Sequence, residues 1–336
     1  MGDLQEQLQH KIDYKTKPLG ALGQLESLAL QIGLVQKTLS PSLVKPTILL
    51  FAADHGIADE GVSAYPKDVT YQMVSNFLNK GAAINVFCRQ NGLNLKLIDA
   101  GVDFDFGNTT GIINKKIARG TKNFLHDNAM SHTQLLECLN AGASVVKELH
   151  NEGCNVIGCG EMGIGNTSSS SMIMSCLTDI PLKKCVGKGT GLDNSRLNNK
   201  LSILQQAMAF HGPITDPMKV METYGGFEIC QMCGAMIEAY KNDMLILVDG
   251  FIATNAFLVA YKMNPQIKRN AIFCHQSDEQ GHKALLEYID VKALLDLNVR
   301  VGEGTGCALA YPLVRAAVAF LNEMDSFEGA GVSNKR

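Results

Sequence analysis

Acids, histidines and glycines follow the apolar runs of this sequence at six places. They are Asp54-His55-Gly56, Asp99, Gly160-Glu161, Asp249, His275 and Glu303. Carboxylates and imidazoles are the side chains that most often move protons in enzymes, and glycine lets a ligand approach the backbone closely. Each residue alone could be a turn or cap residue. Because they recur together at the ends of apolar runs, we expect them to form one active site.

A glycine-rich stretch, CNVIGCGEMGIGNTSSSS at residues 154–171, carries the pattern G-x-G-x-x-G. That pattern is typical of dinucleotide-binding folds, and Asp179 lies at about the distance of a ribose-binding acid. However, no apolar run leads into Asp179, and the charge of Glu161 would repel a pyrophosphate. The hydroxyl-rich helix start favours a single phosphate. The loop is therefore interpreted as a cradle for one ribose phosphate, with a nicotinamide-dependent oxidoreductase and a non-catalytic nucleotide sensor as alternatives.

Unbroken apolar runs of strand length predict a sheet that is buried on both faces. The runs cover residues 47–56, 93–101, 154–163, 244–251, 270–277 and 297–306. Helical patterns at residues 131–150, 225–240 and 277–289 separate them, which indicates an α/β fold with a doubly wound, mostly parallel, Rossmann-like sheet. Ligands of such sheets bind outside the carboxyl ends of the strands, where the acids, histidines and glycines stand.

Two helical segments rich in Leu and Ala flank this α/β region. They are GALGQLESLALQIGLVQ near the N-terminus and TGCALAYPLVRAAVAFLNEM near the C-terminus. Chain termini often lie close together in space. We therefore expect residues 1–39 and 305–336 to form a small helical domain beside a large domain of residues 40–304.

Composition argues against several classes of protein. The net charge is -3 and no run of 18 apolar residues occurs, so we expect neither a nucleic-acid nor a membrane partner. Ten irregularly spaced cysteines are typical of reduced thiols in the cytoplasm, and Cys230 and Cys233 are interpreted as buried helix residues. His275 and His282 lack a recognised metal-ligand spacing, and no G-x-S-x-G nucleophile motif occurs. We expect no metal ion.

Eight segments occur in an order that resembles the nicotinate-nucleotide–dimethylbenzimidazole phosphoribosyltransferase family. They are KPLGALGQLE, AADHGIADEGVSAYP, RGTKNFLHDNAM, GEMGIGNTSSS, GKGTGL, DGFIATNAF, CHQSDEQGH and GEGTGCALAYPL. The resemblance implies a Rossmann-like domain, a small helical domain built from both termini, a homodimer and no metal or redox cofactor. It also implies that phosphoribose moves from nicotinate mononucleotide to dimethylbenzimidazole with inversion, giving nicotinate and α-ribazole 5′-phosphate for the lower ligand of cobalamin.

The resemblance further implies roles for individual residues. Glu303 matches the general base that removes the azole proton, and Glu161 is a second acid that orders the ribose hydroxyls or supports the developing cation. The other candidates are Gly163, Gly165, Asn166, Thr167 and Lys200 at the phosphate, Gly226 and Asp249 at the nucleotide end, and Ser63, Tyr65 and Gln72 in the base pocket. Lys200 could also be a solvated helix residue. Other benzimidazoles, adenine and phenols are alternative acceptors in the family.

Overall fold

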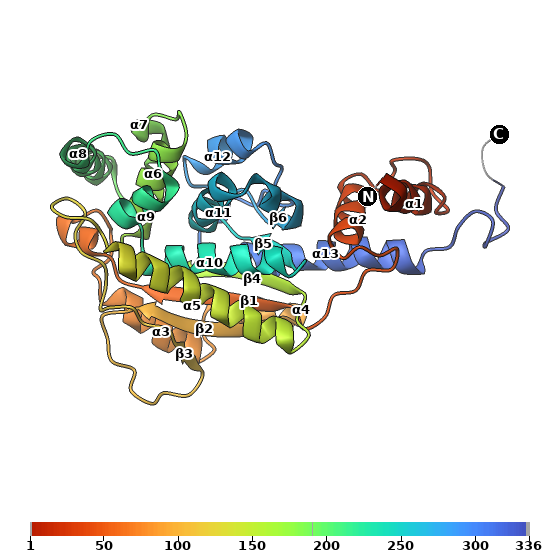
Figure 1. Cartoon of the computed structure of the whole chain (residues 1–336), viewed down its shortest axis with the longest axis horizontal. Coiled ribbons are helices and arrows are strands. Elements are labelled where there is room, and N and C mark those ends of the chain that lie inside the picture. The colour runs from red at the N-terminus through yellow and green to blue at the C-terminus, as the bar shows by residue number, and fades with distance from the viewer. Residues whose placement is uncertain (1, 190, 334–336) are drawn as a thin grey trace.

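Six strands form a sheet in which every neighbouring pair runs parallel (Figure 1). The computed structural model describes residues 2–189 and 191–333, so Thr190 of the GKGTGL segment lies outside the described residues. In sheet order the strands are β3 (Ile112–Asn114), β2 (Asn94–Gly101), β1 (Thr47–Ala53), β4 (Val156–Met162), β5 (Leu245–Val248) and β6 (Ala271–Phe273). This is the order of doubly wound nucleotide-binding sheets, so the predicted fold class is confirmed.

The expected strand at residues 297–306 is wrong. Residues 297–304 form a loop, in which Gly302, Glu303 and Gly304 have φ angles of 76°, 64° and 82°. Three consecutive residues in the left-handed region cannot continue an extended strand. Glu303 therefore lies in a loop just before a helix, and not at the end of a strand.

Strand β1 shows how the sheet is buried on both faces. All seven of its residues are buried, and alternate side chains enter two different apolar clusters. Leu49 and Phe51 face the cluster formed with α5 (His132–Asn151), α6 (Asn166–Leu177), α10 (Phe227–Lys241) and α11 (Phe251–Met263). Ile48 and Leu50 face the cluster formed with α4 (Ala83–Asn91) and α13 (Thr305–Glu323). Each such side chain contributes roughly 1.5–3 kcal/mol when fully buried.

Two of the predicted helices follow local signals closely. Ser131 caps α5 by accepting a hydrogen bond from the Gln134 backbone N–H, which explains where that helix begins. Cys230 and Cys233 are fully buried in α10, as expected. The remaining elements are α1 (Gly2–Asp13), α2 (Gln24–Val35), η1 (Gly56–Glu60), α3 (Val69–Leu78), α7 (Leu182–Cys185), α8 (Asn194–His211), α9 (Pro217–Tyr224), η2 (Pro265–Asn270) and α12 (His282–Ile289).

The two ends of the chain lie side by side. Helices α1 and α2 lie beyond the edge of the sheet with the end of α13 (Figure 1), and Lys15 forms an antiparallel bridge with Ser326. Helix α2 packs on α13, and both belong to the apolar cluster that covers one face of the sheet. Because that cluster is continuous, the division into residues 1–39 with 305–336 and residues 40–304 stays a prediction.

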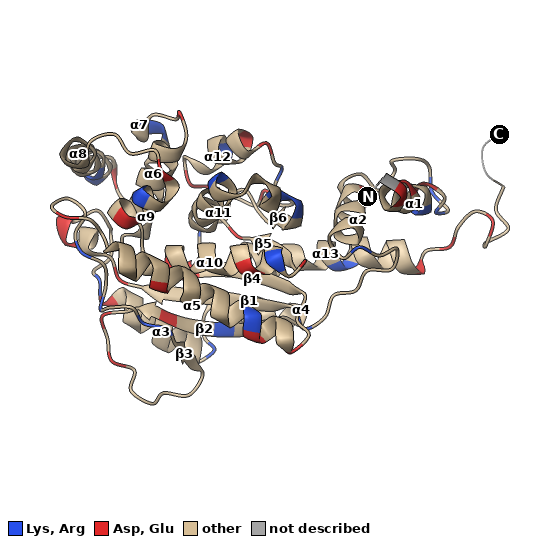
Figure 2. Ribbon diagram, viewed as in Figure 1, with Lys and Arg blue, Asp and Glu red and all other residues tan. Residues whose placement is uncertain are grey.

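Helix α13 is long and apolar enough to cross a membrane by length and composition. It packs against α2, α4 and β4, and 56% of its most apolar window is buried, which is the environment of a core helix. Figure 2 shows acidic and basic residues distributed over the same elements, in keeping with the small net charge.

Candidate active site

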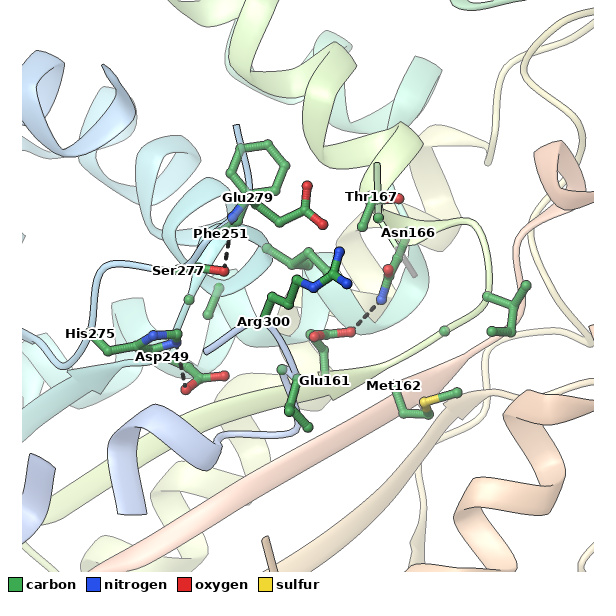
Figure 3. A pocket seen from close by; sticks show the side chains of 18 residues that line it. Glu161, Met162, Asn166, Thr167, Asp249, Phe251, His275, Ser277, Glu279 and Arg300 are labelled. Carbon is green, nitrogen blue, oxygen red and sulfur yellow. Dashed lines mark hydrogen bonds and ion pairs between the residues drawn. The ribbon is translucent and has the colours of Figure 1, made fainter. Parts of the chain in front are cut away.

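The connections that follow β1 and β4 run in opposite directions along the sheet, because β1 leads to β2 and β4 leads to β5. Doubly wound sheets bind their ligands in the crevice at the carboxyl ends of such a pair. A pocket lies beside this crevice, at the carboxyl ends of β4, β5 and β6, and Figure 3 shows its side chains converging from several elements. Its lining includes Glu161, Gly163, Asn166, Thr167, Asp249, Phe251, His275, Ser277, Glu279 and Arg300.

A glycine loop joins β4 to α6 at the floor of this pocket. Gly165 caps α6 with a φ of 100°, which favours glycine, and Asn166 and Thr167 begin the helix. A side chain at Gly163 would press on the backbone oxygen of Ala53, at 2.5 Å from its Cβ position. The loop therefore lies close to the end of β1 and presents the N-terminus of α6, whose positive dipole end favours an anion, although the N–H groups of Asn166 and Ser168 already donate to the carbonyls of Gly163 and Gly165.

Lys200 is a fully buried cation beside this helix start. Its Nζ donates to the Thr167 hydroxyl at 2.8 Å, and no carboxylate of the described residues lies within 4.0 Å of it. Burial lowers the pKa of Lys200 to about 8, although the charge of Glu279 acts in the opposite direction. The alternative of a solvated helix lysine is therefore wrong. A buried ammonium near a helix N-terminus needs an anion for full compensation, and a phosphate would supply it.

Glu161 lies at the end of β4 and is only 7% exposed. Burial raises its pKa to about 8, with further increases from the charges of Glu228, Asp249 and Glu303, while the hydrogen bond from Asn166 Nδ2 acts against them. A Cβ at Gly302 would overlap the Glu161 carboxylate, so the glycine allows the two segments to meet. Near neutral pH this carboxyl can therefore donate a hydrogen bond as well as accept one.

Asp249 fixes the start of α13. Its Oδ2 accepts from the Gly304 N–H at 3.0 Å, and its Oδ1 accepts from the N–H groups of Gly306 at 2.6 Å and Cys307 at 3.3 Å. A carboxylate that accepts several N–H groups at a helix N-terminus is strongly held. Asp249 therefore holds the backbone on the C-terminal side of Glu303, which makes it part of the support for that residue.

The backbone of Glu303 packs closely on β4, and one oxygen of its carboxylate has no hydrogen-bond partner among the described residues. A Cβ at Gly160 would collide with the backbone of Glu303, so the loop packs directly on β4. Burial raises the pKa of Glu303 to about 7; the Ile84 N–H acts against this, and the charge of Asp249 adds to it. Its Oε2 is buried and has no hydrogen-bond partner among the described residues. A proton acceptor with such a pKa is suited to base catalysis near neutral pH.

The structure brings most of the predicted site residues together. Glu161, Gly163, Asn166, Thr167 and Asp249 line the pocket, Gly165 caps its helix, and Lys200 reaches it through Thr167. Gly226 caps α10 and packs on the imidazole of His55. Glu303 adjoins the pocket through Gly302.

The base pocket was predicted from weaker signals. Ser63, Tyr65 and Gln72 do not line the described pocket; Tyr65 is 53% exposed in the segment before α3, and Gln72 lies in α3. Their part in binding a base stays a prediction.

Several pocket residues were missed as site residues by sequence reasoning. Phe251, Ser277, Glu279 and Arg300 all line the pocket. Phe251, Ser277 and Glu279 lie in the segments DGFIATNAF and CHQSDEQGH, and the family resemblance of these segments could have pointed to them. Arg300 lies in the segment that was expected to be a strand. Within residues 2–189 and 191–333, no group of three His, Cys, Asp or Glu side chains is placed to hold a metal ion.

Asp179 lies in the turn after α6 and not at the end of a strand. It is therefore not placed as the ribose-binding acid of a dinucleotide fold, which agrees with the sequence argument against an oxidoreductase.

Comparison with known proteins assigns the family. A family profile described as "Phosphoribosyltransferase" matches residues 2–332. The chain is 54% identical over 335 residues to the nicotinate-nucleotide–dimethylbenzimidazole phosphoribosyltransferase of Dechloromonas aromatica, which covers 99% of this chain and 96% of that protein. It is 49% identical over 330 residues to the protein of the same name from Bacteroides fragilis, which covers 98% and 96%. The crystal structure of CobT from Thermus thermophilus matches with a TM-score of 0.95 at 37% identity, covering 99% of this chain and 100% of that one. The chain therefore belongs to the nicotinate-nucleotide–dimethylbenzimidazole phosphoribosyltransferase family.

Proposed function

We propose that this protein transfers phosphoribose from nicotinate mononucleotide to dimethylbenzimidazole, giving α-ribazole 5′-phosphate and nicotinate in the assembly of the cobalamin lower ligand. The names of relatives that match over nearly the whole chain support this reaction. The observation that carries it in the structure is the buried Lys200 of α8, whose ammonium donates to Thr167 at the start of α6, and Thr167 lines the same pocket as Glu161. Such a cradle suits one phosphate and a ribose.

The phosphate is held by charge and by backbone N–H groups. Lys200 and the Thr167 hydroxyl lie beside the first turn of α6, next to the glycine loop that follows β4. The positive end of the helix and the ammonium both favour an anion. Binding the phosphate here places the ribose toward Glu161, further along the same pocket.

The chemical step needs a base but no acid. The bond between the anomeric carbon and the pyridinium nitrogen breaks, and its electron pair neutralises that nitrogen, so nicotinate leaves without protonation. A nitrogen of the azole attacks the opposite face of the ribose carbon, which inverts its configuration. The proton of the other azole nitrogen passes to the carboxylate of Glu303, whose Oε2 is free to accept it.

Glu161 supports the ribose during this step. Its raised pKa lets it hold a hydrogen bond to a ribose hydroxyl as the neutral acid, and the ionised form stabilises the positive charge that develops on the ribose. Asn166 keeps the carboxyl in place from the first turn of α6. Asp249 holds the Glu303 loop and shapes the nucleotide end.

We assign Ser63, Tyr65 and Gln72 to the pocket of the accepting base, and we propose a homodimer that works in the cytoplasm. Support for the compartment comes from the ten cysteines, all of which are free thiols. Support for the dimer comes from the family resemblance.

Incubating the protein with nicotinate mononucleotide and dimethylbenzimidazole, and measuring nicotinate and product by chromatography, tests the function. We expect release of nicotinate that depends on the base, and its loss in Glu303→Ala with nucleotide binding retained. Folded protein that releases no nicotinate with any azole or phenol would contradict the proposal. A panel of benzimidazoles, adenine and phenols then identifies the preferred acceptor.

A further inference from the structure

A buried histidine and a buried glutamate contact each other next to the glycine loop, and neither side chain has a role in the proposed reaction. His55, which follows β1, places its Nε2 at 2.6 Å from Oε1 of Glu228, in the first turn of α10. Both side chains have an exposure of 0%. The second oxygen of Glu228 has no hydrogen-bond partner among the described residues.

The same imidazole also contacts α6. Its Nδ1 lies 3.1 Å from the hydroxyl of Ser169, in the first turn of that helix. The ring therefore joins three elements that meet at the pocket: the end of β1, the start of α6 and the start of α10. The two partners His55 and Glu228 are 173 residues apart in sequence, so only the folded molecule brings them together.

The ring also packs on the backbone of the phosphate cradle. A Cβ at Gly163 would lie 3.2 Å from ring atoms of His55, and one at Gly165 would lie 3.3 Å from the Cβ of His55. A Cβ at Gly226 would also overlap the ring, at its Cε1 and Nε2 atoms. The imidazole is thus enclosed between glycines, with no room for the loop to move toward it.

Stability alone is a weak reason for such a pair. Taking two charged or strongly polar groups out of water is costly, and apolar residues of similar volume are often as stable or more stable in the same place. An unpaired buried carboxylate oxygen adds to that cost. A pair retained at this position needs another role.

We infer that His55 and Glu228 are positioning residues, which hold the Gly163–Gly165 loop and the first turn of α6 in place beside the phosphate of the nucleotide. The contact of Nε2 with Glu228 fixes the ring against α10, and the ring fixes the loop. The inference rests on the proposed use of a phosphoribosyl nucleotide, because the loop is taken to hold its phosphate.

Two substitutions of His55 test the contacts of its two ring nitrogens separately. The side-chain amide of glutamine can take the place of Nε2 and still donate to Glu228, whereas that of asparagine can replace only Nδ1. We expect His55→Asn to weaken binding of nicotinate mononucleotide about tenfold, measured by calorimetry and as KM, with the KM for dimethylbenzimidazole unchanged. His55→Gln is expected to recover most of that affinity.

A double substitution removes the pair without leaving a charge. His55→Leu with Glu228→Met keeps the volume similar, so we expect a melting temperature at or above that of the wild type but the same loss of nucleotide affinity. His132→Asn is the matched control, because His132 also pairs with a glutamate, Glu222, but its side chain is 63% exposed. It should leave nucleotide binding unchanged.

The outcomes distinguish the inference from the function on which it rests. If His55→Asn or the double variant binds nicotinate mononucleotide as tightly as the wild type does, His55 and Glu228 are not positioning residues. Equal losses in His55→Asn and His55→Gln would also overturn the inference. If the wild type itself neither binds nor consumes nicotinate mononucleotide, the proposed function fails instead.

Discussion

Replacing Glu303 by glutamine should make the protein more stable and less active. The pKa of this carboxyl rises from 4.5 to about 7 on folding, mainly because it is buried. The folded state therefore binds the proton more tightly than the unfolded chain does. Between pH 4.5 and pH 7, stability falls as the pH rises, and above pH 7 the whole penalty of a buried carboxylate is present.

The size of the penalty follows from the two pKa values. A difference between 4.5 and about 7 corresponds to roughly 3 kcal/mol at pH 8, and to almost nothing at pH 4. Glutamine has nearly the same shape without the charge, so it removes this penalty. We expect Glu303→Gln to raise the melting temperature at pH 8 by roughly 5 °C, and to leave it nearly unchanged at pH 4.

Activity should move in the opposite direction, because glutamine cannot take the azole proton. Losing a general base typically costs about 10²–10⁴-fold in rate, so we expect kcat to fall at least about 100-fold. The assays are thermal denaturation at both pH values and nicotinate release. Glu323→Gln, at an exposed position in the last turn of α13, is the matched control and should change neither quantity. Equal effects on stability at pH 4 and pH 8, or a kcat close to that of the wild type, would refute this reasoning.

Four further outcomes are expected. Lys200→Met should raise the KM for nicotinate mononucleotide roughly 10- to 100-fold without lowering the melting temperature, since a charged hydrogen bond contributes about 1.5–3 kcal/mol and the lost ammonium is buried. A profile of kcat/KM against pH should rise through about 7 as Glu303 ionises and fall above about 8 as Lys200 loses its charge; a flat profile from pH 6 to 9 would contradict both assignments. Gly160→Ala should cost about 1–3 kcal/mol of stability, measured by denaturation, and lower kcat more than it raises KM, because the new methyl group displaces the backbone of Glu303. Asp249→Asn should lower kcat and the melting temperature together, since it weakens the cap of α13; unchanged stability would show that the cap is dispensable.

The sequence allowed the main elements of the sheet to be predicted because buried strands are unbroken apolar runs. Strand β1 fits this rule, since every one of its residues is buried. Strand β3 was missed because it has three residues at the edge of the sheet, and none of them is fully buried. The loop before α13 was mistaken for a strand because its apolar residues, such as Val299 and Val301, precede glycines whose left-handed φ angles no hydrophobic pattern reveals.

The site was predictable where its residues stand in a short motif. Glu161 ends β4, and Gly163 and Asn166 follow it closely, so one strand end places them together. The contact between His55 and Glu228 was not predictable, because the two residues lie on different elements, 173 positions apart, and no local pattern links them. Likewise, the burial of Lys200 depends on how α8 packs over the start of α6, which the local sequence does not determine.

The order of the strands along the chain also determines which parts of the sheet are synthesised first. Residues 47–114 hold three adjacent strands, so half of the sheet can assemble while the rest of the chain is still being made. Glu303 follows all six strands in the chain, so it leaves the ribosome after them, at a rate of roughly 5–20 residues per second. Helix α13 packs on β4 and directly follows Glu303, so the site is complete only once this helix has docked. Competence for catalysis therefore requires the segment that follows all six strands, and a nascent chain that stalls before Glu303 lacks the proposed base.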